Sequence, residues 1–140
     1  MLNIHGTLVS YQNKGILLLG ESGSGKSDLA LRLIMEHGAK LVADDRVILE
    51  EKNNELWGYA PEILINKLEV RGIGIVEFEA KQKEKISLCI SLCKNRTDVD
   101  RLPQPQFTDF LGISVAKLEL YPFDCSTICK IMLKICGKIS

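Results

Sequence analysis

Apolar and polar positions alternate in short runs along most of this chain, which is the period of β-strands. The alternation is cleanest at 86–93, where isoleucine and leucine occupy one face and serine and cysteine the other. Polar turns at 12–15 and 50–55 separate neighbouring apolar runs closely enough to predict two hairpins. Strands are therefore expected at 4–11, 16–19, 41–43, 47–50, 56–59 and 86–93.

One segment of the first half repeats its apolar residues at helical spacing. Leu29 and Leu33 are four residues apart, and either Arg32 or Glu36 extends the same face of a helix over about 26–36. The pair His37-Gly38 predicts the end of this helix, because glycine readily takes the left-handed conformation that closes helices. A helix among many short strands predicts an α/β fold with a strand-rich, mixed sheet.

The second half of the chain is less regular. Residues 62–68 follow the break at Ala60-Pro61 and suggest a helical turn or short helix, and glycines two apart argue against a regular strand throughout 69–76. The remaining segments are expected to be a charged, flexible stretch at 77–85, a proline-containing loop at 96–109, and apolar segments at 115–121 and 128–135. In the last of these, every second residue from 129 to 135 shares one face, as in a strand.

The strongest candidate for chemistry is the glycine-rich loop, residues 20–27, which reads GESGSGKS and directly follows the apolar run at 15–19. It matches G-x-x-x-x-G-K-[ST] without a mismatch, a pattern whose backbone amides cradle phosphate groups at the start of a helix. The alternative is a chance glycine-rich turn. The residues expected to contact a nucleotide phosphate are Gly20, Glu21, Ser22, Gly23, Ser24, Gly25, Lys26 and Ser27, with Lys26 reaching the outer phosphates and Ser27 available to Mg²⁺.

Other polar residues could complete a phosphate-transfer site. Asp44 and Asp45 close the short apolar run at 41–43 and should point to opposite faces, so they are expected to serve different roles, such as holding a metal or accepting a proton. The alternative is a solvated strand end. Taken alone, His5 is as well explained by packing or surface exposure, and the pair Glu69 and Arg71 by an ordinary salt-bridged strand.

Composition narrows the class of protein. The length of 140 residues predicts one domain, 1–140, that buries roughly two-thirds of its unfolded surface. Eighteen basic and eighteen acidic residues cancel, which gives no indication of a nucleic acid or an anionic membrane as partner. No apolar run approaches the roughly 20 residues of a membrane span, and the first residues lack a signal-peptide pattern. A cytoplasmic protein is expected.

The five cysteines do not indicate a zinc site or a set of disulfide bonds. None forms C-x-x-C and neither histidine is near them, which argues against zinc, and an odd count without a secretory signal argues against a disulfide framework. Free thiols, mostly buried, are expected.

The order of these segments resembles the catalytic domain of the bacterial HPr kinase/phosphorylase family. The resemblance covers most of residues 3–76 and is specific, because ADDRV at 43–47 and EVRGIGI at 69–75 are not general features of phosphate loops. The later part is similar to the short, single-domain form typical of alphaproteobacteria, which lacks the N-terminal domain of longer members. The matching segments are 4–9, 20–27, 41–47 and 68–75, with weaker similarity at 100–103 and 121–124.

This resemblance implies a nucleotide-binding core like that of PEP carboxykinase and a bifunctional, homo-oligomeric enzyme. Such an enzyme uses ATP and Mg²⁺ to phosphorylate a serine of the phosphocarrier protein HPr, and removes that phosphate with inorganic phosphate, releasing pyrophosphate. The resemblance also implies roles for individual residues. Lys26 binds phosphate, Ser27 and Glu69 bind magnesium, His5 and Arg71 belong to the catalytic site, and Asp45, with Asp44 beside it, aligns best with the group that accepts and returns the proton.

The chain also departs from the longer family members. Those members carry a glycine-arginine-asparagine segment near their C-terminal strand, whereas 122–126 of this chain has no arginine. This departure raises a second hypothesis, a regulatory module that binds ATP without transferring phosphate. A third, a small-molecule kinase with the same loop, lacks recognisable lid and base-recognition motifs.

Overall fold

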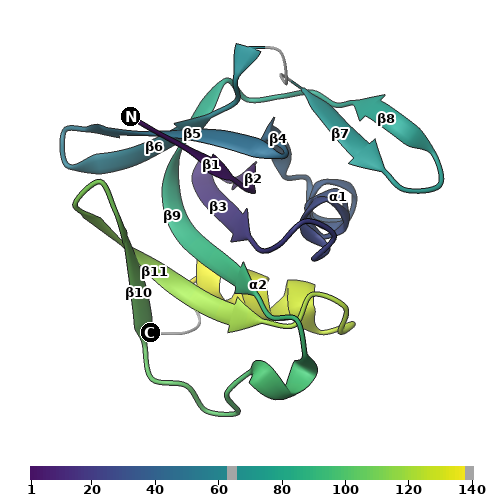
Figure 1. Ribbon diagram of the computed structural model, residues 1–140, viewed down its shortest axis with the longest axis vertical. Coiled ribbons are helices and arrows are strands. Elements are labelled where there is room, and N and C mark those ends of the chain that lie inside the picture. Colours follow the sequence, from purple (N-terminus) through teal and green to yellow (C-terminus); the bar gives the residue numbers. More distant parts are fainter. Residues whose placement is uncertain (63–65, 138–140) are drawn as a thin grey trace.

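The computed structural model, described here for residues 1–62 and 66–137, is a curled, mixed β-sheet with two α-helices (Figure 1). In the described residues the main sheet has nine strands, and a separate two-stranded hairpin lies beside it. The sheet strands are β1 (Leu2–His5), β2 (Thr7–Tyr11), β3 (Lys14–Leu19), β4 (Lys40–Ala43), β5 (Arg46–Lys52), β6 (Glu55–Tyr59), β9 (Lys83–Leu92), β10 (Gln106–Phe110) and β11 (Ile113–Leu120). The hairpin is β7 (Lys67–Val70) and β8 (Gly74–Glu77), and the helices are α1 (Lys26–His37) and α2 (Thr127–Ile135).

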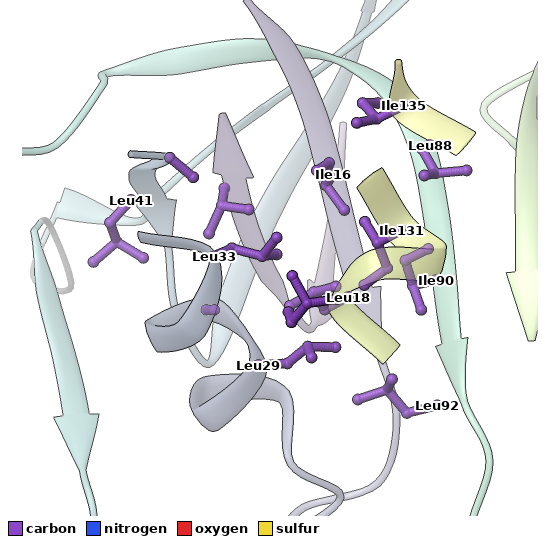
Figure 2. Packing of buried hydrophobic residues seen from close by; sticks show 14 of the residues in the cluster. Ile16, Leu18, Leu29, Leu33, Leu41, Leu88, Ile90, Leu92, Ile131 and Ile135 are labelled. Carbon is purple, nitrogen blue, oxygen red and sulfur yellow. The ribbon is translucent and has the colours of Figure 1, made fainter. Parts of the chain in front are cut away.

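Both helices pack against one face of the sheet. Side chains from β3 and β9 meet those of α1 and α2 in the larger buried cluster, which includes Leu18, Leu29, Ile90 and Ile131 (Figure 2). A second cluster lies on the other face, where β5 and β6 curl over the sheet and bury Leu8, Leu17 and Leu49. The strand-rich α/β class predicted from the sequence is confirmed. No helix among the described residues has the length and apolar character needed to cross a membrane.

The expected hairpins and the first helix are confirmed. Two-residue turns with positive φ at Gln12-Asn13 and Asn53-Asn54 connect β2 to β3 and β5 to β6, the geometry that matches the twist of paired strands. Helix α1 ends at Gly38, whose left-handed backbone (φ 73°) brings its N–H within 3.1 Å of the Ile34 carbonyl oxygen.

The single strand expected at 4–11 is instead two strands that separate at Gly6. Strand β1 pairs with β5, whereas β2 pairs with β3 and β4. The Gly6 N–H donates to the Asp45 carbonyl oxygen at 3.1 Å, and a Cβ at Gly6 would lie 3.1 Å from the Leu18 carbonyl oxygen. The break therefore depends on contacts between segments far apart in the sequence.

Several expectations for the middle of the chain need correction. The helical turn expected at 62–68 falls partly outside the described residues, and its last two positions begin β7. The expected irregularity of 69–76 is confirmed, because a turn separates β7 from β8. The stretch 77–85 is not uniformly flexible: β9 already begins at Lys83, and Glu84 is buried in an ion pair of 2.7 Å with Lys81. The loop expected at 96–109 contains a 3-10 turn (Arg96–Asp98) and ends in β10.

The strand period assigned to 128–135 is wrong, because this segment is helix α2. Ile128, Ile131 and Ile135 are buried at helical spacing, whereas Cys129 and Leu133 are exposed. The segment carries apolar residues at both periods, and counting Cys129 as a core residue favoured the wrong one.

The cysteines were expected to be free and mostly buried, and the second part of this expectation is wrong. All five thiols are free, but Cys125, Cys129 and Cys136 are exposed, and only Cys89 is fully buried, which raises its pKa to about 11.

Replacing Ile131 with alanine is expected to lower the free energy of unfolding by about 2–5 kcal/mol, because the side chain is fully buried between the helices and the sheet. The matched variant Leu133→Ala, on the exposed face of α2, should change it by only about 0.5 kcal/mol. Urea unfolding followed by circular dichroism measures both. Equal losses in the two variants would contradict the helical arrangement.

Candidate active site

The sheet topology brings the glycine-rich loop and the two aspartates to one edge. Strands β3 and β4 both run antiparallel to β2, so they are parallel to each other. The carboxyl ends of parallel strands lie at the same edge of a sheet, where α/β proteins commonly bind ligands. The loop 20–27 follows β3 and Asp44-Asp45 follows β4, which is why residues far apart in the sequence meet here.

The glycine-rich loop is shaped around the ammonium group of Lys26. This side chain is 7% exposed, and its Nζ donates hydrogen bonds to the carbonyl oxygens of Gly20 at 2.7 Å and Glu21 at 2.9 Å. Burial lowers the pKa of Lys26, while the nearby carboxylates of Asp44 and Asp45 act in the opposite direction. The ammonium group is thus held by backbone carbonyl oxygens of the loop itself.

The loop also leaves backbone donors available at the start of α1. The first helical hydrogen bond runs from Leu29 N to the Gly25 carbonyl oxygen at 2.9 Å, so the amides of residues 25–28 have no acceptor within the helix. Gly25, with φ 100°, begins the helix without a side-chain cap. The Ser24 hydroxyl is also buried without a hydrogen-bond partner. Together these donors suit a bound anion such as phosphate.

Asp44 connects the end of β4 to the glycine-rich loop by hydrogen bonds. The Ser27 hydroxyl donates to its carboxylate oxygens at 2.9 Å and 3.2 Å, and the buried Thr7 hydroxyl donates to Oδ1 at 2.8 Å. Only 8% of Asp44 is exposed, so these two hydroxyls fix the orientation of the carboxylate. Sequence reasoning missed Thr7, because a threonine at the start of an apolar strand gives no signal until the fold places it against Asp44.

Asp45 has a different environment from Asp44, but the cause is not the expected alternation along a strand, because β4 ends at Ala43 and Asp45 lies in a turn. Its backbone takes a left-handed conformation (φ 69°), and Arg46 N donates back to the Asp44 carbonyl oxygen at 2.8 Å across a tight turn. Its side chain is 65% exposed and lies 3.4 Å from His5 Nδ1. His5, at the end of β1, is thus brought to the site beside Asp45. A strained, exposed carboxylate next to an imidazole is suited to meeting a substrate.

Glu69 and Arg71 belong to the separate hairpin rather than to the sheet edge. Glu69 lies on β7 and alternates with Leu68 and Val70, which are buried in the cluster that contains α1. The Glu69 side chain is exposed, as is Arg71 in the turn that follows. No hydrogen bond or ion pair joins either residue to the loop 20–27 within the described part of the chain. Their roles at the site remain predictions.

A magnesium ion bound with a nucleotide fits the polar groups at this edge. In kinases and related enzymes Mg²⁺ uses one or two carboxylates together with phosphate oxygens, rather than a cage made by the protein alone. Ser27 and Asp44 offer a hydroxyl and a carboxylate within hydrogen-bond distance of each other. Among residues 1–62 and 66–137 no three histidine, cysteine or acidic side chains form a group that could hold a metal ion by themselves.

A cavity lies apart from the candidate site residues. A cavity of about 620 Å³ lies between the loop 96–106, β11 and α2, and its lining includes Arg96, Lys117 and Tyr121. None of the candidate site residues lines it. The candidate site is instead defined by the hydrogen bonds of Lys26, Ser27 and Asp44 at the strand ends.

A mixed α/β sheet with a glycine-rich loop opening a helix defines the class of phosphate-binding α/β proteins, and comparisons with known proteins define the family. The sequence model of the family described as HPr Serine kinase C-terminal domain matches residues 1–132. This chain therefore belongs to the HPr serine kinase C-terminal domain family.

Relatives and solved structures agree with this assignment. The chain is 42% identical over 127 residues to an HPr kinase/phosphorylase of Clostridium botulinum, and 39% identical over 129 residues to that of Lactobacillus delbrueckii subsp. bulgaricus, with 84% of this chain covered in both cases. The structure of the Hpr(Ser) kinase/phosphatase from Coxiella burnetii matches with a TM-score of 0.82 at 26% identity, covering 99% of this chain and 90% of that one. The chain spans about two fifths of the length of these curated relatives, 41% and 40% respectively.

Proposed function

We propose that this domain transfers the γ-phosphate of ATP to a serine hydroxyl of an HPr-type phosphocarrier protein in a reaction that requires Mg²⁺. We propose in addition the reverse chemistry, in which inorganic phosphate removes the serine phosphate and pyrophosphate is released. The observation that carries the proposal is the hydrogen bond from the Ser27 hydroxyl to Asp44, because it joins the glycine-rich loop to the aspartate pair, both within the residues that the family model matches. The names of the relatives support the same reaction.

Binding of the triphosphate would rely on the start of α1. The free amides of residues 25–28 and the positive end of the helix dipole attract phosphate oxygens, and Lys26 can exchange its carbonyl partners for the outer phosphates. Mg²⁺, held by Ser27 and Asp44 and by Glu69 if the β7–β8 hairpin closes over the site, would neutralise phosphate charge when bound.

Asp45 is the group we assign to the serine proton. In the forward direction the serine oxygen bonds to the γ-phosphorus as the bond to the β-phosphate bridging oxygen breaks, and Asp45 takes the hydroxyl proton. In reverse, a phosphate oxygen attacks the phosphoserine phosphorus, and protonated Asp45 returns the proton to the departing serine oxygen. His5, 3.4 Å from Asp45, orients this carboxylate. Arg71 is assigned to phosphate charge on the substrate side.

The protein partner would approach from the exposed side of Asp45. The tip of the β7–β8 hairpin carries Ile73 and Ile75, 78% and 72% exposed, on a segment that also holds Glu69 and Arg71. An apolar tip next to charged residues is suited to contact with a protein surface. The same proposal includes a cytoplasmic homo-oligomer, whose order can be measured by light scattering.

Incubating the purified protein with HPr, Mg²⁺ and γ-labelled ATP is expected to label one serine of HPr. Adding excess inorganic phosphate should then remove the label and release pyrophosphate. HPr with alanine in place of the target serine is the matched control for the acceptor. ATP binding without transfer to any HPr-type protein would contradict the kinase and favour the regulatory module, whereas labelling without later pyrophosphate release would contradict only the reverse activity.

A further inference from the structure

The turn after β11 lies on the opposite side of the glycine-rich loop from the aspartates. Strand β11 runs parallel to β9, and β9 runs parallel to β3, so their carboxyl ends share one edge (Figure 1). Across that edge the strand order is β4, β2, β3, β9, β11. The loop that follows β3 is therefore flanked by Asp44-Asp45 after β4 on one side and by residues 121–124 after β11 on the other.

Phe123 in this turn rests against the end of the loop. A Cβ placed on Gly25 would lie 3.1 Å from two carbons of the Phe123 ring and 3.3 Å from Pro122 Cβ, so the ring touches the backbone next to Lys26. Phe123 is nevertheless 57% exposed. An aromatic ring thus stands beside the phosphate-binding backbone with part of its surface open to solvent.

The ring is held in place by its neighbours. Arg32 of α1 donates from Nη2 to the Pro122 carbonyl oxygen at 2.5 Å, and the Thr127 hydroxyl donates to the Tyr121 carbonyl oxygen at 2.6 Å. The Tyr121 ring meets Phe123 edge-on, with 5.6 Å between centroids and 79° between planes. Arg96 in turn lies over Tyr121 at 5.0 Å and pairs with Asp124 at 2.7 Å. A fixed, exposed ring is well suited to stacking, since little order is lost when a flat ligand binds.

The segments on the two sides of the loop, Asp44-Asp45 and residues 121–124, determine which way a bound triphosphate would point. The reacting end must face Asp45, which lies on the β4 side of the loop. The nucleoside end therefore leaves the cradle on the β11 side, where Phe123 stands. We propose that Phe123 is the stacking platform for the nucleobase, an aromatic purine ring system in the case of ATP. This inference rests on the proposed function for the orientation of the triphosphate, and adds a base site that the glycine-rich loop does not provide.

The test compares two ligands that differ in the nucleoside. The dissociation constants of ATP and of inorganic tripolyphosphate, both with Mg²⁺, are measured by calorimetry for the wild-type chain and for Phe123→Leu. Leucine keeps an apolar side chain against Gly25 but lacks an aromatic face. ATP is expected to bind about 5- to 100-fold more weakly to the variant, because stacking on an aromatic side chain contributes about that factor. Tripolyphosphate should bind within about 2-fold of the wild type, because it makes no base contact.

Two further variants separate stacking from folding. Phe123→Tyr retains an aromatic face and should keep the affinity for ATP. Phe107→Leu changes another exposed phenylalanine, on β10, and should leave both affinities unchanged. Equal losses for ATP and tripolyphosphate in Phe123→Leu would overturn the platform, since the ring would then only support the loop, and an unchanged affinity for ATP would overturn it as well. A wild-type chain that binds neither ligand would contradict the proposed function itself and the platform with it.

Discussion

Replacing Lys26 with alanine is expected to lower phosphate transfer from ATP to HPr by about 10²- to 10³-fold, the scale of loss when one donor aimed at the negative charge of a transition state is removed. Lys26 is almost fully buried and its Nζ lies among the carbonyl oxygens of the loop. An ammonium group shielded from water interacts more strongly with phosphate than an exposed one. The loss should appear in kcat as well as in the affinity for ATP, because the transferred phosphate gains charge on its way to the serine oxygen.

Controls for Lys26 must separate charge from loop structure. Lys26→Ala also removes the two bonds to Gly20 and Glu21, so urea unfolding is compared with the wild type. Lys40→Ala removes an exposed lysine on β4 and should leave transfer unchanged. Steady-state kinetics with labelled ATP measures phosphate transfer to HPr by the wild type, Lys26→Ala and Lys40→Ala. Transfer within 10-fold of the wild type in a folded Lys26→Ala protein would contradict the assignment of Lys26 to the phosphates.

The glycine-rich loop and α1 could be predicted because their determinants are adjacent in the sequence. The spacing of Gly20, Gly25, Lys26 and Ser27, the apolar run before them and Gly38 after the helix are all local signals. The asparagine turns were predictable for the same reason, since Asn13 and Asn53 tolerate the left-handed backbone that two-residue hairpins require.

Features that depend on distant contacts could not be read from the sequence. The division of the first strand at Gly6 requires the Asp45 carbonyl oxygen, and the orientation of Asp44 requires Thr7, 37 residues away. The prediction for helix α2 was wrong for another reason. Its apolar residues fit both a period of two and a helical period, and only packing against the sheet distinguishes Ile128 from Cys129. The position of the aromatic turn at 121–124 beside the loop could not be predicted either, since it follows from the parallel pairing of β11 with β9.

Replacing Asp45 with asparagine is expected to lower transfer by about 10²- to 10⁴-fold, the usual contribution of a positioned acid or base. Asparagine suits this test because it tolerates the left-handed backbone found at Asp45, so the tight turn is kept while the proton acceptor is lost. ATP affinity should stay within about 3-fold, because the Asp45 side chain is 65% exposed and pairs with His5. Both directions of the reaction should fall together, since the same carboxylate takes and returns the proton.

Asp44→Asn provides the comparison that decides between the two carboxylates. Asp44 accepts hydrogen bonds from Ser27 and Thr7 at Oδ1, so its amide variant keeps this acceptor but loses the charge that strengthens both bonds and places a donor at Oδ2, 3.2 Å from the Ser27 hydroxyl. Its expected signature is a higher Mg²⁺ concentration for half-maximal transfer and a lower free energy of unfolding, whereas Asp45→Asn should change neither. Magnesium titrations of transfer and urea unfolding measure both. If transfer survives in Asp45→Asn but is lost in Asp44→Asn at saturating Mg²⁺, the proton acceptor is Asp44, and His5 would then orient a residue outside the chemistry.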